Sequence, residues 1–101
     1  MSSTELTLVR VYLTEGQDGI DDVIHWLEKD SGVHGFTLFR GIAGLGNSGH
    51  MHTASLLDLS SSLPLVFEFF DKPDSVSQIL EQLQTFVDPD HIISWPVTSG
   101  I

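Results

Sequence analysis

The residues best suited to chemistry in this chain gather in one stretch, from Gly41 to Thr53, which reads GIAGLGNSGHMHT. It holds four of the nine glycines of the sequence. Glycine has no Cβ, so its backbone N–H can approach a ligand closely. Arg40 directly precedes the stretch, and a guanidinium binds phosphates and carboxylates through two parallel donors. The sequence predicts an anion site at Arg40, Gly41 and Gly44; an ion pair between Arg40 and an acid of a neighbouring subunit is the alternative.

Two histidines close the same stretch. His50 and His52 are two residues apart, so on a strand both side chains point to one side. Paired imidazoles can bind zinc or copper, and His91 is a distant candidate for a third ligand. We favour a hydrogen-bonding role for His52, either in orienting the stretch or in contacting a nucleotide. A metal site at His50 and His52 stays open as an alternative.

No catalytic constellation stands out in the sequence. Cysteine is absent, which excludes thiol catalysis and cysteine metal sites. Residues 44–49 match the G-x-G-x-x-G pattern, but no convincing helix start follows them, and a dinucleotide-binding fold needs one. We therefore expect a binding protein without an enzymatic reaction, and a small nucleotide-dependent enzyme stays open as an alternative.

Length and charge narrow the class of protein further. The 101 residues suit a single domain over 1–101, and the formal net charge is −10. Acidic proteins repel nucleic-acid backbones and anionic membranes, so neither is an expected partner. No apolar run approaches the 18 residues of a membrane-spanning helix, and Met1–Glu5 lacks the features of a signal peptide. We expect a cytoplasmic protein with no membrane insertion.

Apolar patterning predicts the elements that must position these residues. Strands are expected at 6–13, 33–42, 65–70 and 91–97. One helix is expected from a cap at Asp18 to a stop at Gly32, and a second over 75–87, with Ser75 and Gln78 as a capping box. The order βαβ–loop–βαβ predicts an α+β, ferredoxin-like βαββαβ sandwich with a long loop, 43–62, between its second and third strands.

Two of the predicted strands, LVRVYL and LVFEFF, are apolar on both faces. Helices cover one face of such a sheet, so the other must be buried against something else. We therefore expect an oligomer that buries the open face.

Three blocks of the sequence carry a resemblance to a known family. They are FRGIAGLG at 39–46, HTASLLDLS at 52–60 and LPLVFEFFD at 63–71. In this order and spacing they resemble the DUF190 family, and the resemblance spans residues 5–97.

Members of that family resemble the PII signalling proteins, which are trimers of ferredoxin-like subunits with nucleotides in the clefts between subunits. The resemblance implies a homotrimer that binds a small anionic effector and presents its mobile 41–62 loop to a protein target, a transporter or an enzyme. It also implies that Gly46, Thr53 and His91 line the cleft. His91 lies in the turn 88–91. Because basic residues are few, AMP or ADP suits the chain better than a triphosphate.

Overall fold

The computed structural model describes residues 3–16, 19–45, 51–53 and 63–100. The elements are strand β1 (Thr4–Thr14), helix α1 (Ile20–Lys29), strands β2 (Thr37–Arg40), β3 (Ala43–Leu45), β4 (Met51–Thr53) and β5 (Pro64–Asp71), helix α2 (Pro73–Leu83), the 3₁₀ turn η1 (Pro89–His91) and strand β6 (Ile92–Ser99).

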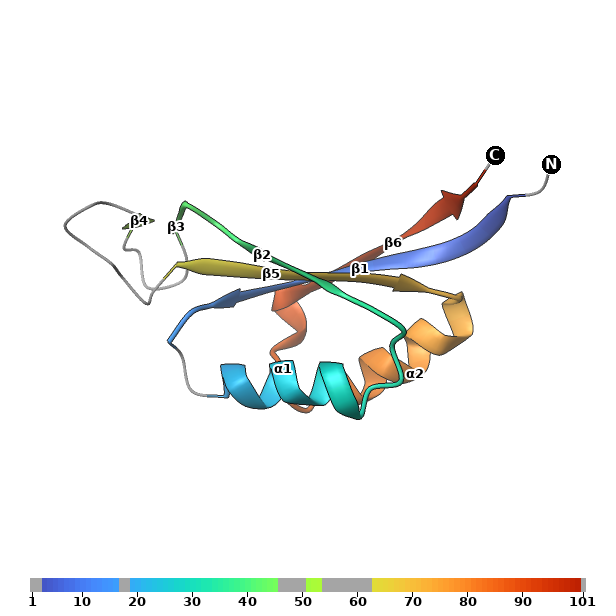
Figure 1. Cartoon of the computed structure of the whole chain (residues 1–101), viewed down its shortest axis with the longest axis horizontal. Helices are drawn as coiled ribbons and strands as arrows, with labels where there is room; N and C mark the ends of the chain where they lie inside the picture. The colour runs from blue at the N-terminus through green and yellow to red at the C-terminus, as the bar shows by residue number, and fades with distance from the viewer. Residues whose placement is uncertain (1–2, 17–18, 46–50, 54–62, 101) are drawn as a thin grey trace.

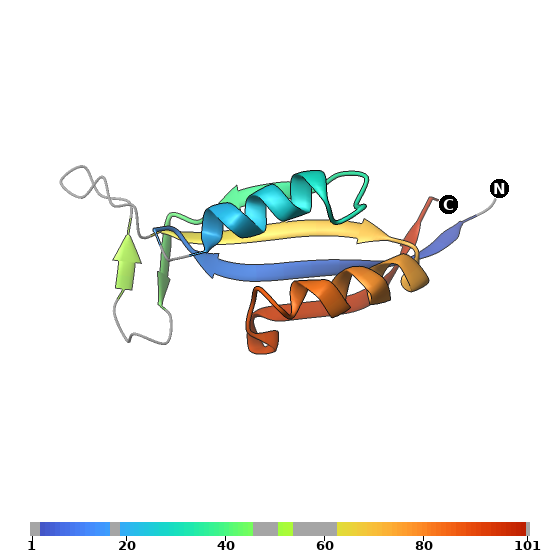
Figure 2. The ribbon, with the colours of Figure 1, turned by 90° about the horizontal axis from the view of Figure 1, so that it is seen from below.

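Four of the strands form one antiparallel sheet in the order β2-β5-β1-β6. Both helices lie on one face of it (Figure 1), α1 toward β2 and β5 and α2 toward β1 and β6 (Figure 2). Among the described residues, no helix lies on the other face. The predicted ferredoxin-like α+β fold is confirmed.

Strict alternation along the two central strands builds the core. Val9 and Val11 of β1 and Phe67 and Phe69 of β5 are buried, while the residues between them point to the open face. The helices supply the other half of the core from residues spaced three and four apart, namely Val23, Trp26 and Leu27 of α1 and Val76, Ile79 and Leu83 of α2.

The second predicted strand is shorter than expected, because only Thr37–Arg40 of the range 33–42 pairs in the sheet. The chain first has to turn after α1. Ser31 Oγ donates to the carbonyl of Leu27 and accepts from the Val33 N–H, and Gly32 has a φ of +82°. Val33 and Phe36 pack against the core from this connection rather than from a strand.

The predicted bounds of the second helix are also wrong. Helix α2 begins at Pro73 and ends at Leu83, and no side chain of the described residues caps its N-terminus. Proline is well suited to a first helical position, since its missing N–H needs no partner there. The capping box at Ser75 and Gln78 does not form because the helix starts two residues earlier. Residues 85–87 continue as hydrogen-bonded turns to Gln82 and Leu83.

Helix α1 begins after Gly19, whose φ is +89°. Asp18, the predicted cap, lies outside the described residues, as do 46–50 and 54–62 of the predicted loop. Within that loop, β3 and β4 form a two-stranded hairpin with Gly44 opposite His52.

Candidate functional site

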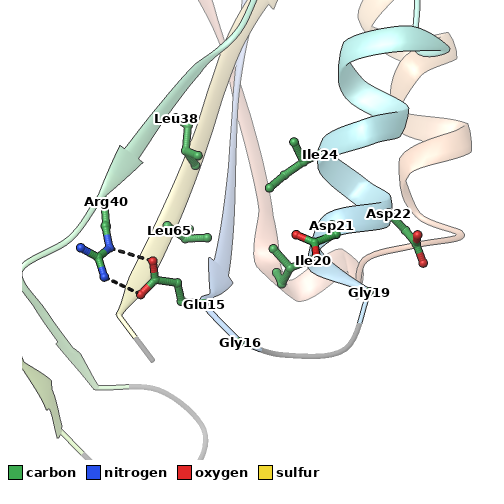
Figure 3. A pocket seen from close by; sticks show the side chains of 10 residues that line it. All are labelled: Glu15, Gly16, Gly19, Ile20, Asp21, Asp22, Ile24, Leu38, Arg40 and Leu65. Atoms are coloured by element: carbon green, nitrogen blue, oxygen red, sulfur yellow. Dashed lines mark hydrogen bonds and ion pairs between the residues drawn. The ribbon is translucent and has the colours of Figure 1, made fainter. Parts of the chain in front are cut away.

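Arg40, the last residue of β2, makes a two-pronged ion pair with Glu15. Its Nε donates to Glu15 Oε2 at 2.7 Å and its Nη2 donates to Oε1 at 2.9 Å. Figure 3 shows the two side chains facing each other across the end of the sheet. These two hydrogen bonds lower the pKa of the Glu15 carboxyl and raise the pKa of the Arg40 guanidinium. Arg40 thus pairs with an acid of its own chain, and the ion pair with a neighbouring subunit stays a prediction.

Topology brings these two residues together. Strands β1 and β2 are both antiparallel to β5, so they run in the same direction and end at the same end of the sheet. Glu15 directly follows β1, and its N–H donates to the Leu63 carbonyl at 2.8 Å. In return the Leu63 N–H donates to Glu15 Oε1 at 3.3 Å. Glu15 therefore ties the ends of β1 and β2 to the residue before β5.

Gly41 and Gly44 lie against the ring of Pro64. The Gly41 N–H donates to the Pro64 carbonyl at 2.8 Å. A Cβ at Gly41 would stand 2.6 Å from Pro64 Cγ, and one at Gly44 would stand 2.8 Å from it. Both glycines are thus required for close approach to a proline. We call Glu15, Arg40, Gly41, Leu63 and Pro64 the neck, because segment 41–62 leaves and re-enters the sheet between them.

An open groove of about 720 Å³ lies beside the neck, between the start of α1 and the ends of β2 and β5 (Figure 3). Its apolar lining comes from Ile20, Ile24, Leu38 and Leu65. Its charged lining consists of three carboxylates and one guanidinium, namely Glu15, Asp21, Asp22 and Arg40. Asp21 and Asp22 lie in the first turn of α1, where carboxylates favour the positive end of the helix dipole. With an excess of negative charge, this groove offers an anion no attractive side chain besides Arg40.

The remaining predicted site residues lie in several places. His52 and Thr53 belong to β4, opposite Gly44 and Ala43 of β3. Gly46 and His50 lie outside the described residues.

His91 ends η1, directly before the edge strand β6, whereas Arg40 lies on the opposite edge strand. Three strand spacings of about 4.8 Å separate the two edges. In one subunit Arg40 and His91 therefore lie at edges of the sheet about 14 Å apart.

Among the side chains that the structure describes, in residues 3–16, 19–45 and 63–100, no group of three or more His, Asp or Glu could hold an ion. The alternative metal site at His50 and His52 lies outside them and stays a prediction. In the described part of the chain neither helix is long and apolar enough to cross a membrane.

The open face of the sheet is markedly apolar. Large exposed side chains from all four strands project from it, namely Tyr12, Phe39, Phe70, Ile93 and Trp95. Near the middle, Arg10 Nε donates to Glu68 Oε2 at 2.7 Å, and the Arg10 guanidinium lies 5.6 Å from the centre of the Trp95 ring. The only charged pair that the described residues place on this face is thus internally neutralised.

Sequence reasoning missed three residues of the neck, Glu15, Leu63 and Pro64. All three could have been found from the predicted topology. In a β-α-β unit the two strands run in the same direction, so an acid just after the first strand lies near a base that ends the second. Leu63 and Pro64, at the start of the third strand, lie where segment 41–62 rejoins the sheet.

Known proteins resemble this chain over most of its length. A UPF0166 protein from Aquifex aeolicus (strain VF5) is 33% identical over 81 residues, which cover 76% of this chain and 77% of that protein. CPII from Thiomonas intermedia K12, solved with ADP and bicarbonate, has a TM-score of 0.70 at 20% identity, covering 99% of this chain and 93% of its own.

A second structure of CPII is described as a nitrogen regulatory PII-like protein bound to ADP, AMP and bicarbonate. It has a TM-score of 0.72 at 19% identity, and the match covers 99% of this chain and 92% of the CPII chain. These likenesses show that the fold is PII-like. The family model DUF190 (Uncharacterized ACR) matches residues 6–99. The chain therefore belongs to the DUF190 family.

Proposed function

We propose that this protein is a PII-like regulatory protein that binds a small anionic effector, AMP or ADP, in clefts between the subunits of a homotrimer. Regulation would occur by binding, without a chemical step. Binding would alter the arrangement of segment 41–62, which meets a protein target, a transporter or an enzyme, in the cytoplasm.

The neck is the observation that carries this proposal. Segment 41–62 joins the sheet through a few contacts, among them the Arg40–Glu15 pair and the Gly41–Pro64 hydrogen bond. An anion that engages Arg40 therefore acts at the point where the whole segment is anchored. A ligand shifts an equilibrium between two arrangements of the segment by as much as its affinity differs between them.

The open face supports the trimer. Water-exposed Tyr12, Phe70 and Trp95 on a helix-free sheet face form the kind of apolar patch that marks an interaction site. Self-association would bury this patch.

The proposed cleft uses residues from both edges of the sheet. The proposed ligand-binding residues are Arg40, Gly41, Gly44, Gly46, His52, Thr53 and His91. Gly41 would contact the ligand through atoms other than its N–H, which donates to the Pro64 carbonyl. Arg40 and His91 lie at opposite edges of the sheet, which suits a site that two neighbouring subunits complete. The structures of CPII with ADP and AMP support adenine nucleotides as the first ligands to test.

The test combines light scattering with calorimetry. The mass should be three times the 11.1 kDa of one chain, and AMP or ADP should bind with one site per subunit. A stable monomer would remove the inter-subunit cleft. A trimer that binds neither nucleotide would remove the nucleotide effector.

A further inference from the structure

The Glu15 carboxylate occupies Arg40 in the way that a bound anion would. Oε2 accepts from Arg40 Nε at 2.7 Å, and Oε1 accepts from Arg40 Nη2 at 2.9 Å. Oε1 also accepts from the Leu63 N–H at 3.3 Å. One edge of a guanidinium together with a backbone N–H is a common arrangement for holding a carboxylate or a phosphate. Here the anion is part of the chain.

We propose that Glu15 is a built-in competitor of the effector, whose carboxylate occupies Arg40 and so lowers the affinity of every anion that binds there. This rests on the proposed function, since it takes Arg40 as the effector's anion-binding residue. An incoming anion can bind the Nε and Nη2 donors of Arg40 only after it has displaced both hydrogen bonds to Glu15.

Covalent attachment gives Glu15 an advantage over anions of similar strength. A tethered group has an effective concentration in the millimolar range or above, so a simple carboxylate such as acetate competes poorly. A phosphate carries more charge and more acceptor oxygens, and it competes better. Glu15 therefore lowers the affinity of all anions by the same factor, and only those that bind Arg40 strongly, such as phosphates, still bind at low concentration.

Displacement of Glu15 also reaches the neck. The carboxylate that leaves Arg40 is the same one that accepts from the Leu63 N–H, one residue before β5. Gly41, the residue after Arg40, is bound to Pro64. Binding at Arg40 thus acts on both ends of segment 41–62.

Calorimetry with AMP, inorganic phosphate and acetate on the full chain tests the proposal. Glu15→Gln keeps the size of the side chain and an oxygen for Leu63, but removes the charge. We expect it to bind AMP and phosphate about fivefold more tightly than the wild type, the size expected for the loss of an exposed ion pair. Acetate should gain by about the same factor, because removal of a built-in competitor raises the affinity of every anion equally. Glu15→Asp, one methylene shorter, should show a smaller gain.

Two controls separate this mechanism from others. Glu81→Gln, at an exposed position of α2, changes the net charge equally and should leave affinity unchanged. Adding Arg40→Ala to Glu15→Gln should abolish the gain. An equal gain in Glu81→Gln would overturn the proposal in favour of a general charge effect.

The outcomes for this inference and for the nucleotide effector are distinguishable. If AMP binds the wild type and Glu15→Gln equally, Glu15 does not compete, and the nucleotide function stands. If only phosphate and acetate bind, and more tightly to Glu15→Gln, the competition is real and the nucleotide effector is wrong. If no anion binds any variant, both are overturned.

Discussion

Gly41 lies so close to Pro64 that a Cβ at residue 41 would stand 2.6 Å from the Pro64 Cγ atom. The Gly41 N–H also donates to the Pro64 carbonyl. The two residues flank segment 41–62, one at its start and one just after its end. Their contact fixes the separation of the segment's two ends at the sheet.

Gly41→Ala should therefore destabilise the protein by about 1–3 kcal/mol, the usual cost of forcing extra atoms into a closely packed site. Urea unfolding measures this directly. The matched control is Gly35→Ala, because a Cβ at Gly35 meets nothing within 4 Å. Gly35→Ala should be neutral or slightly stabilising.

Pro64→Ala tests whether the proline ring is the cause. Combined with Gly41→Ala, it should recover part of the lost stability, since the clash involves the ring carbon Cγ, which alanine lacks. If the double variant shows only the sum of the two single losses, the ring contact is not responsible.

The open face of the sheet gives a prediction about assembly. Phe70 is 57% exposed on this face, and Leu45 is 66% exposed on the β3–β4 hairpin. Phe70→Glu should abolish the trimer in light scattering, because association would bury the new charge without a partner. Leu45→Glu, a comparable change away from the face, should leave the mass unchanged. A trimer that survives Phe70→Glu would place the interface elsewhere.

Glu15 should make stability depend on pH in a defined direction. Hydrogen bonds from Arg40, helped by the Leu63 N–H and opposed by desolvation, hold its pKa below the ordinary 4.5 in the folded protein. The unfolded chain then takes up the proton first as the pH falls. Stabilisation by Glu15 is therefore complete above pH 4.5 and is lost as the pH drops through the folded-state pKa.

Unfolding of the wild type and Glu15→Gln from pH 7 to pH 3 measures this contribution. Other acids titrate in both proteins, so the difference in the free energy of unfolding isolates Glu15. The wild type should be more stable at pH 7, and the difference should shrink below pH 4.5. A difference that is constant over this range would contradict an ionic role.

The overall fold was predictable because periodicity reports burial. Val9, Val11, Phe67 and Phe69 alternate with residues of the open face, and the helix spacings identify the buried sides of α1 and α2. Element ends were less predictable, since they depend on local hydrogen bonds. The turn at Ser31 shortened the second strand, and Pro73 moved the start of α2.

The candidate site was predictable only in part. Arg40 and the glycines stand out by type and position, but the partner of Arg40 is 25 residues away in sequence. The pair depends on where two strands end, which periodicity locates only approximately. The role of Gly41 and Gly44 against Pro64 depends on ångström-scale packing, which no sequence pattern reports.

Calorimetric titration of AMP and ADP into the wild type and Arg40→Ala tests the central claim most directly. Loss of a charge-assisted contact should weaken nucleotide binding by about 10- to 100-fold. Arg40→Lys should recover only part of this, since lysine keeps the charge but lacks the planar fork. Light scattering and melting curves establish that each variant is a folded trimer. Unchanged nucleotide affinity in a well-folded Arg40→Ala trimer would contradict the account.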